Sequence, residues 1–101
     1  MLYKLTVPGP IEDVEEVRVL EWHGGPGHAF APGDLVVELE THKALVEVRA
    51  GQAGVLRRII SQAGDWQGLG EAVAIFSDTE DEPAPDSAEG LAALAVDFEV
   101  S

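Results

Sequence analysis

The sequence of 101 residues predicts an all-β domain, organised as a two-fold symmetric sandwich of short strands. Two observations predict this class. Hydrophobic residues make up 46% of the chain, and most stand in short runs of Val, Leu, Ile and Ala broken by Gly and Pro, which is typical of β-proteins. A segment from the middle of the chain also recurs near its end, and such a repeat favours two similar halves. The length suits one small domain with an extension.

The first element is Leu2-Tyr3-Lys4-Leu5-Thr6-Val7, which alternates like a β-strand. This region lacks the long apolar stretch and the small-residue cleavage site of a secretory signal. No apolar run in the chain is long enough to span a bilayer. We therefore expect a cytoplasmic protein that does not use a membrane as a partner.

The next elements form the internal repeat. Residues Gly27–Asp34 resemble Gly64–Glu71, because each stretch has two glycines six positions apart with an acidic residue after the second. At the same offset of 37 positions, the apolar run Leu35–Leu39 matches Ala72–Phe76. Two similar strand-turn-strand units are therefore expected on either side of the central hairpin.

That hairpin is predicted by a two-residue period over residues 37–48. One face carries Val37, Leu39, Ala44, Val46 and Val48, and the other carries Glu38, Glu40, Leu45 and Glu47. The turn falls at residues 41–44, where no glycine supplies a positive φ, so a primed two-residue turn is not expected. Lys43 should therefore stand in water at the tip of the hairpin.

Several motifs of residues 3–77 resemble those of lipoyl (biotinyl/lipoyl-attachment) domains from the acyltransferase components of 2-oxo acid dehydrogenase complexes. The attachment turn of that family, Glu-Thr-Asp-Lys-Ala, is similar to Glu40-Thr41-His42-Lys43-Ala44. Its Gly-Asp turns resemble Gly33-Asp34 and Gly64-Asp65, and its Ala-Gly-Val strand entry resembles Ala53-Gly54-Val55. His42 and His28 are departures, since each stands where the family usually has Asp. Neither blocks an amide bond to the lysine, although His42 places an imidazole beside it where the family has a carboxylate.

The resemblance implies a flattened barrel, or barrel-sandwich hybrid, of two short antiparallel sheets with quasi-two-fold symmetry, and lipoate amide-linked to Lys43. It implies an acyl and electron carrier without catalytic residues. Its partners would be a lipoate-attaching enzyme and the 2-oxo acid decarboxylase, acyltransferase and dihydrolipoamide dehydrogenase components of a complex. Side chains expected to take part in recognition surround the tip: Glu40, Thr41, His42, Ala44 and Glu47.

Two alternatives remain open at this point. Biotin carriers of a carboxylase have the same architecture, but they typically set the lysine between two methionines, and the only methionine here is Met1. The same fold can also serve as an adaptor with nothing attached, because a fold does not settle a function.

Residues 78–101 form an acidic extension beyond the predicted carrier domain, residues 1–77. Residues 78–87 are rich in acidic residues with Pro and Ala, as in a flexible linker. Residues 91–100 are apolar again, and they fit a docked helix, an extra strand with Val96, Phe98 and Val100 on one face, or the start of a further domain. The formal net charge is −13, of which −8 belongs to this extension. Such a charge disfavours nucleic acid as a partner and suits a basic docking surface.

Other chemistries are not expected from the sequence. The chain has no cysteine, and its three histidines, His23, His28 and His42, show no regular ligand spacing, so no metal site is predicted. The glycine-rich stretch at residues 24–27 is not followed by the Lys-Ser/Thr of a phosphate-binding loop. Trp22 and Trp66 are expected to pack at the core or at an edge of a sheet.

Overall fold

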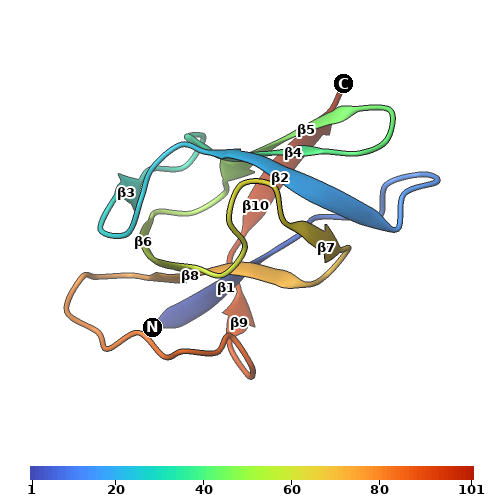
Figure 1. Cartoon of the computed structure of the whole chain (residues 1–101). Coiled ribbons are helices and arrows are strands. Elements are labelled where there is room, and N and C mark those ends of the chain that lie inside the picture. The colour runs from blue at the N-terminus through green and yellow to red at the C-terminus, as the bar shows by residue number, and fades with distance from the viewer.

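Strands alone build the computed structural model, which describes all of residues 1–101 (Figure 1). The strands are β1 Leu2–Thr6, β2 Glu16–Trp22, β3 Ala29–Phe30, β4 Leu35–Glu40, β5 Leu45–Ala50, β6 Gly54–Ile59, β7 Trp66–Gly68, β8 Ala72–Ser77, β9 Ala92–Ala93 and β10 Val96–Val100. The all-β prediction is thereby confirmed. No helix is present that has the length and apolar character needed to cross a membrane.

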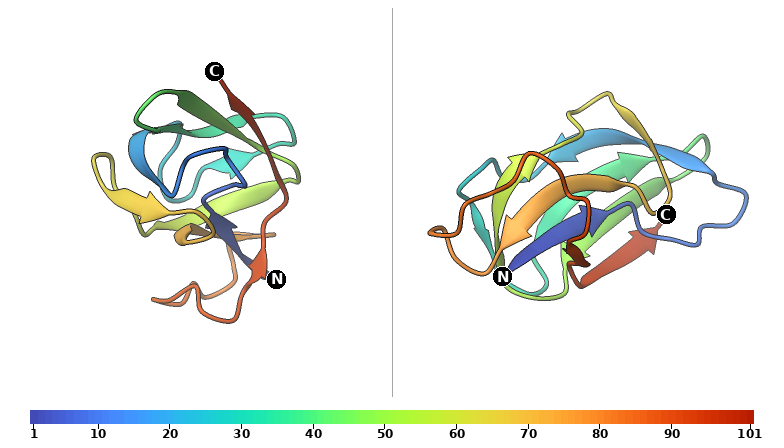
Figure 2. Two further views of the ribbon diagram at one scale, coloured as in Figure 1. Left: turned by 90° about the vertical axis from the view of Figure 1, so that its right-hand side faces the viewer. Right: turned by 90° about the horizontal axis from the view of Figure 1, so that it is seen from below.

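The strands form two five-stranded sheets that face each other (Figure 2). Their orders are β3-β6-β8-β1-β9 and β10-β5-β4-β2-β7. Every pairing is antiparallel except the short one between β1 and β9, which is parallel. The expected pair of short antiparallel sheets is therefore present, but the sheets are not closed into a barrel, because no ladder of hydrogen bonds joins their edge strands.

The two-fold symmetry read from the repeat is visible in the strand order. Read outward from β3 and from β7, the sheets are β3-β6-β8-β1-β9 and β7-β2-β4-β5-β10, so the repeated segments occupy equivalent places. The repeated glycines also share a conformation: φ is +96° at both Gly27 and Gly64, +93° at Gly33 and +84° at Gly70. An L-residue rarely adopts this region, which explains glycine at these turns in both halves.

The core lies between the inner faces of the two sheets. In the hairpin, Val37, Leu39, Val46 and Val48 are each at most 1% exposed, whereas the glutamates that alternate with them face outward. The opposite sheet contributes Leu56, Phe76 and their neighbours to the same cluster. Burial of this apolar face makes the main contribution to the free energy that holds β4 and β5 in register.

The C-terminal segment adds one strand to each sheet. β9 lies beside β1, and β10 pairs with β5 so that Phe98 faces Val48 and Val100 faces Val46. Of the three alternatives for residues 91–100, the extra strand is the one that the structure shows. Val96 and Phe98 point inward and pack against the core.

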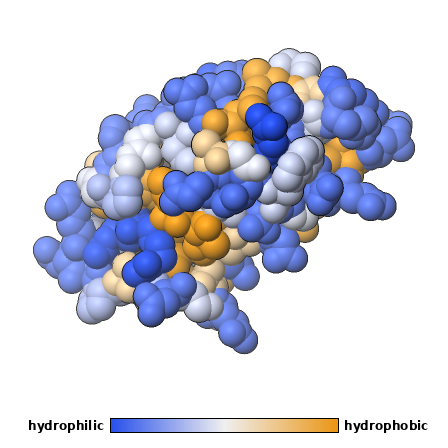
Figure 3. All heavy atoms as spheres, viewed as in Figure 1, coloured by the Kyte–Doolittle hydropathy of each residue, from blue (hydrophilic) through white to orange (hydrophobic).

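The acidic residues before β9 lie against two arginines of β6. Arg57 donates hydrogen bonds to the carbonyl groups of Thr79 and Glu82, and Arg58 Nε donates to the carbonyl of Pro85 over 3.1 Å. The Arg58 guanidinium also lies 3.2 Å from the Asp86 carboxylate. The division of the chain at residue 77 stays a prediction. Elsewhere the surface in view is mostly hydrophilic, with only small, separate apolar patches (Figure 3).

Candidate functional site

The β4–β5 hairpin ends in the turn that carries Lys43. The two strands pair from Leu35 and Arg49 up to Glu40 and Leu45, and the buried side chains of Leu39 and Val46 anchor the last part of the ladder. The turn therefore projects from a ladder that is packed on the core almost to its end. In Figure 1 it lies at the end of the molecule opposite the N-terminus.

Thr41 organises this turn. The residue is only 4% exposed, and its Oγ1 accepts hydrogen bonds from the amides of Lys43, at 3.1 Å, and Ala44, at 2.9 Å. The Thr41 amide donates to the carbonyl of Ala44 over 2.8 Å. No residue of the turn has a positive φ, as expected for a turn without glycine. A threonine hydroxyl thus pairs the backbone groups that the turn would otherwise leave to water.

Lys43 is exposed and has one ionic neighbour. Its side chain is 51% accessible, and Nζ lies 3.6 Å from Oδ2 of Asp13 in the loop between β1 and β2. That loop and the hairpin turn lie at the same end of the molecule (Figures 1 and 2). Both groups are well solvated, so the pair adds little to stability. A primary amine in this position is open to acylation by a second protein.

Two open hollows have Lys43 in their lining. One is lined by Pro10, Ile11, Val14, Ala44 and Val100, together with Lys43 itself. The other includes Trp66 and Ser101. Ser101 exchanges two backbone hydrogen bonds with Leu45, at 2.8 and 2.9 Å, so the C-terminal strand reaches the base of the turn.

Comparisons with known proteins show the family to which the chain belongs. The Biotin_lipoyl family model, described as "Biotin-requiring enzyme", matches residues 3–76. The chain belongs to this family. A solved structure of the lipoyl domain of the 2-oxoglutarate dehydrogenase complex from Azotobacter vinelandii superposes with a TM-score of 0.63 at 31% identity, covering 74% of this chain and 95% of that one.

Two relatives have the same description, the dihydrolipoyllysine-residue succinyltransferase component of the 2-oxoglutarate dehydrogenase complex. The Bacillus subtilis protein is 33% identical over an alignment of 85 positions that covers 81% of this chain and 20% of the relative. The Cupriavidus necator protein is 40% identical over 74 residues, which are 73% of this chain and 18% of the relative. The chain thus spans about a fifth of these proteins, and it is homologous to their lipoyl domains. A carrier domain that is itself non-catalytic follows from this similarity.

The lysines of this lipoyl domain differ in their surroundings. The chain has two, Lys4 and Lys43. Lys4 lies within β1, opposite Ile75 of β8 and Ala93 of β9, and is half-buried. Only Lys43 stands on a turn, so its surroundings fit an amide-linked group that must reach other proteins.

Of the residues predicted to take part in recognition, residues 40–42 and 44 lie at the tip, whereas Glu47 lies farther along β5, opposite Glu38. His42 is exposed, Glu40, Ala44 and Glu47 are half-buried, and Thr41 is buried. Their role in recognition stays a prediction, and for Thr41 the structure shows a direct part in shaping the turn. Sequence reasoning missed Asp13, Trp66 and the end of β10. No spacing in the sequence points to them, because they come from segments far from the hairpin.

The two tryptophans have different surroundings. Trp22 is half-buried and packs against the core, and its Nε1 donates a hydrogen bond to the carbonyl of Ser61 over 2.9 Å. This agrees with the packing role expected for it. Trp66 begins the edge strand β7 and is 52% exposed, so it lies at an edge of the sheet but contributes little to the core.

Proposed function

We propose that Lys43 carries lipoate in amide linkage and that the domain works as an acyl and electron carrier of a 2-oxo acid dehydrogenase complex. The observation that carries the proposal is the placement of the lysines: one amine stands at the apex of a hairpin, and the other is half-buried within a sheet. The similarity to lipoyl domains supports the choice of lipoate.

The chain's own residues present the attachment point. The packed ladder of β4 and β5 and the Thr41 hydrogen bonds restrain the backbone of the turn, while Lys43 extends into solvent. A restrained base with a mobile arm raises the local concentration of the attached group at several partner sites in turn. When attached, lipoate supplies the acyl-transfer and redox chemistry.

Attachment changes the electrostatics of the tip. Amide formation removes the ammonium charge of Lys43 and with it the ion pair to Asp13. A neutral arm costs less free energy to desolvate when it enters an apolar channel of a partner enzyme. The freed Asp13 carboxylate adds to the negative charge around the tip, which comes from Glu40 and the rest of an acidic protein.

The partners follow from the relatives as a proposal. We expect a lipoate-attaching enzyme and, within the complex, the decarboxylase, acyltransferase and dihydrolipoamide dehydrogenase components. A net charge of −13 would steer the domain toward basic surfaces on these proteins and increase the rate of encounter at low salt.

The test is the intact mass of the full chain after incubation with a lipoate ligase, ATP and lipoate. We expect one lipoyl group on the wild type, one on Lys4→Gln, and none on Lys43→Gln. Exchange of His42 and Lys43 keeps the lysine count but moves the amine by one position within the turn. We expect that exchange to abolish modification.

Four results would contradict the proposal. They are a lipoyl group on Lys4, equal labelling of the exchanged variant, a biotinyl mass on protein recovered from cells that hold both attaching enzymes, and an unmodified mass under all conditions. The biotinyl mass would instead support a biotin carrier. An unmodified mass under all conditions would support an adaptor.

A further inference from the structure

Four glutamates lie in one row across the outer face of the second sheet. Glu21 of β2 pairs with Glu38 of β4, Glu38 with Glu47 of β5, and Glu47 with Glu99 of β10. Like charges directly opposite each other on adjacent strands are destabilising. Only one cation is paired with this row: Arg49, 4.0 Å from Glu47 and therefore at the limit of an ion pair. The Glu21 end of the row has no arginine or lysine partner.

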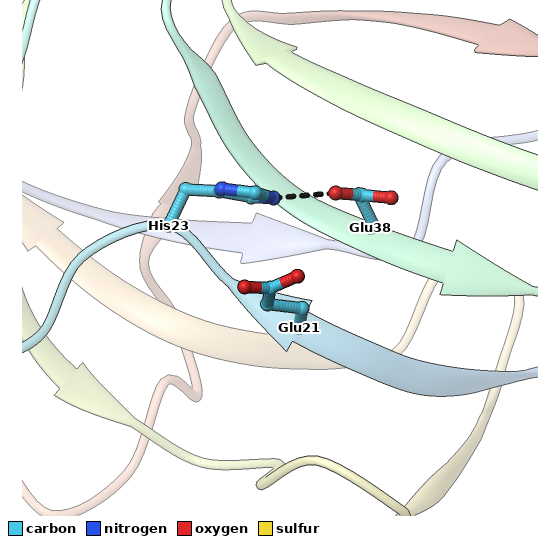
Figure 4. Close-up of side chains that lie close together, drawn as sticks. All are labelled: Glu21, His23 and Glu38. Carbon is cyan, nitrogen blue, oxygen red and sulfur yellow. Dashed lines mark hydrogen bonds and ion pairs between the residues drawn. The ribbon is translucent and has the colours of Figure 1, made fainter.

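A histidine stands at that end. His23 follows β2, and its amide donates to the carbonyl of Val36 over 2.9 Å, which holds its backbone beside β4. Its Nε2 lies 2.6 Å from Oε1 of Glu38. Figure 4 shows the imidazole pointing at Glu38, with the Glu21 carboxylate beside the pair. One ligand atom from each of the three side chains lies within 4.8 Å of the others.

A β-bulge brings these groups to the same face. The ladder between β2 and β4 changes register between Val19 and Glu21, so that Glu21 pairs with Glu38 instead of continuing the earlier alternation. Bulges of this kind re-aim a side chain, and they occur often beside functional sites. Without the bulge, Glu21 would pair with Val37 instead of Glu38.

We propose that Glu21, His23 and Glu38 form a binding site for a divalent first-row transition ion such as Zn²⁺. One imidazole nitrogen and two carboxylate oxygens are a donor set that Zn²⁺ accepts, with the remaining positions open to water. Two carboxylates and a neutral imidazole balance the charge of the ion. The negative charges of Glu47 and Glu99, farther along the row, also attract a cation. The three ligand atoms lie within 4.8 Å of one another, and the Glu21 side chain is exposed.

The site would join β2 to β4, the strand that leads into the Lys43 turn. Glu38 lies two residues before the end of β4. An ion bound there would therefore link the end of β4, just before the turn, to β2. The bound ion would therefore stabilise the folded domain by mass action. This proposal is independent of the group on Lys43, and it can fail while the carrier function stands.

The experiment is a titration of the metal-free full chain with Zn²⁺, followed by calorimetry and by NMR spectra of the histidine rings. We expect one ion per chain, shifts of the His23 ring signals, and a rise in the melting temperature. His23→Gln and Glu38→Gln should each weaken binding by at least about tenfold, because each removes a ligand. His42→Gln is the matched control, since it makes the same change at an exposed histidine of the tip, and it should keep the wild-type affinity.

Other outcomes overturn the proposal. One is wild-type affinity weaker than about 1 mM. Another is equal affinity in the wild type and His23→Gln, or equal affinity for Ca²⁺, which prefers oxygen ligands only; either would mean general attraction of cations to an acidic surface. If His23→Gln does not fold, Glu21→Gln is compared with Glu99→Gln, which removes the same charge from the same row outside the donor set. Equal loss of affinity in these two variants would also mean general attraction.

Discussion

The C-terminal strand is predicted to be an integral part of the folded domain, although it lies outside residues 3–76, which the family model matches. Phe98→Ala tests this. Phe98 points inward from β10, packs against the core and pairs with Val48 of β5. Glu99→Ala is the matched control, because Glu99 is the next residue of the same strand and faces outward into solvent.

The expected loss follows from the burial of Phe98. Truncating a fully buried Phe to Ala costs about 3–5 kcal/mol, and Phe98 keeps part of its surface in water. We therefore expect the free energy of unfolding to fall by about 2 kcal/mol, at roughly half of the fully buried cost. In a domain of this size, that corresponds to a decrease in melting temperature of about 8–16 °C. Glu99→Ala should change stability by less than about 0.5 kcal/mol.

The assay is urea and thermal unfolding by circular dichroism, combined with amide hydrogen exchange. The Leu45 amide donates to the carbonyl of Ser101 over 2.9 Å, so its protection reports directly on β10. Phe98→Ala should speed exchange at Leu45 more than at Val46. Equal stability of Phe98→Ala and Glu99→Ala, with the Leu45 amide unprotected in the wild type, would refute the integral role of β10.

Two further changes test the turns. Thr41→Val keeps the side-chain volume but removes the acceptor of two amides, so we expect a loss of about 1 kcal/mol and faster exchange of the Lys43 and Ala44 amides; unchanged exchange there would contradict the role of the hydroxyl. Gly64→Ala places a Cβ at φ +96°, so we expect a loss of about 1–2 kcal/mol in urea unfolding. Gly25→Ala, which has open space for a Cβ and no positive φ, should cost less, and equal losses would show that the turn tolerates a side chain.

Local patterns predicted much of the fold and the position of the lysine. The two-residue period assigned Val37 and Val46 to the core and placed Lys43 on a turn, because strand periodicity and turn position are properties of adjacent residues. The repeated glycines predicted the two-fold arrangement for a similar reason. A turn that needs a positive φ favours glycine at that position, so two similar turns have glycines at the same spacing.

The parts that were not predicted depend on contacts between distant segments. No pattern placed Asp13 beside Lys43, since their proximity depends on how the loop after β1 crosses the end of the sheet. The sheets also remain open where a flattened barrel was expected, and short edge strands such as β3 do not bond across to the other sheet.

By itself, the sequence determined an all-β chain with two similar halves and one lysine at the apex of a hairpin, because each of these follows from short-range spacing. Only the tertiary structure decided that β10 lies beside β5 and that Glu21, His23 and Glu38 share one surface. Those neighbours depend on strand pairing and on a bulge that shifts the register of β2. Pairing and register are set by the packing of side chains on a common core. Residues from distant segments form that core, so no short stretch of sequence specifies it.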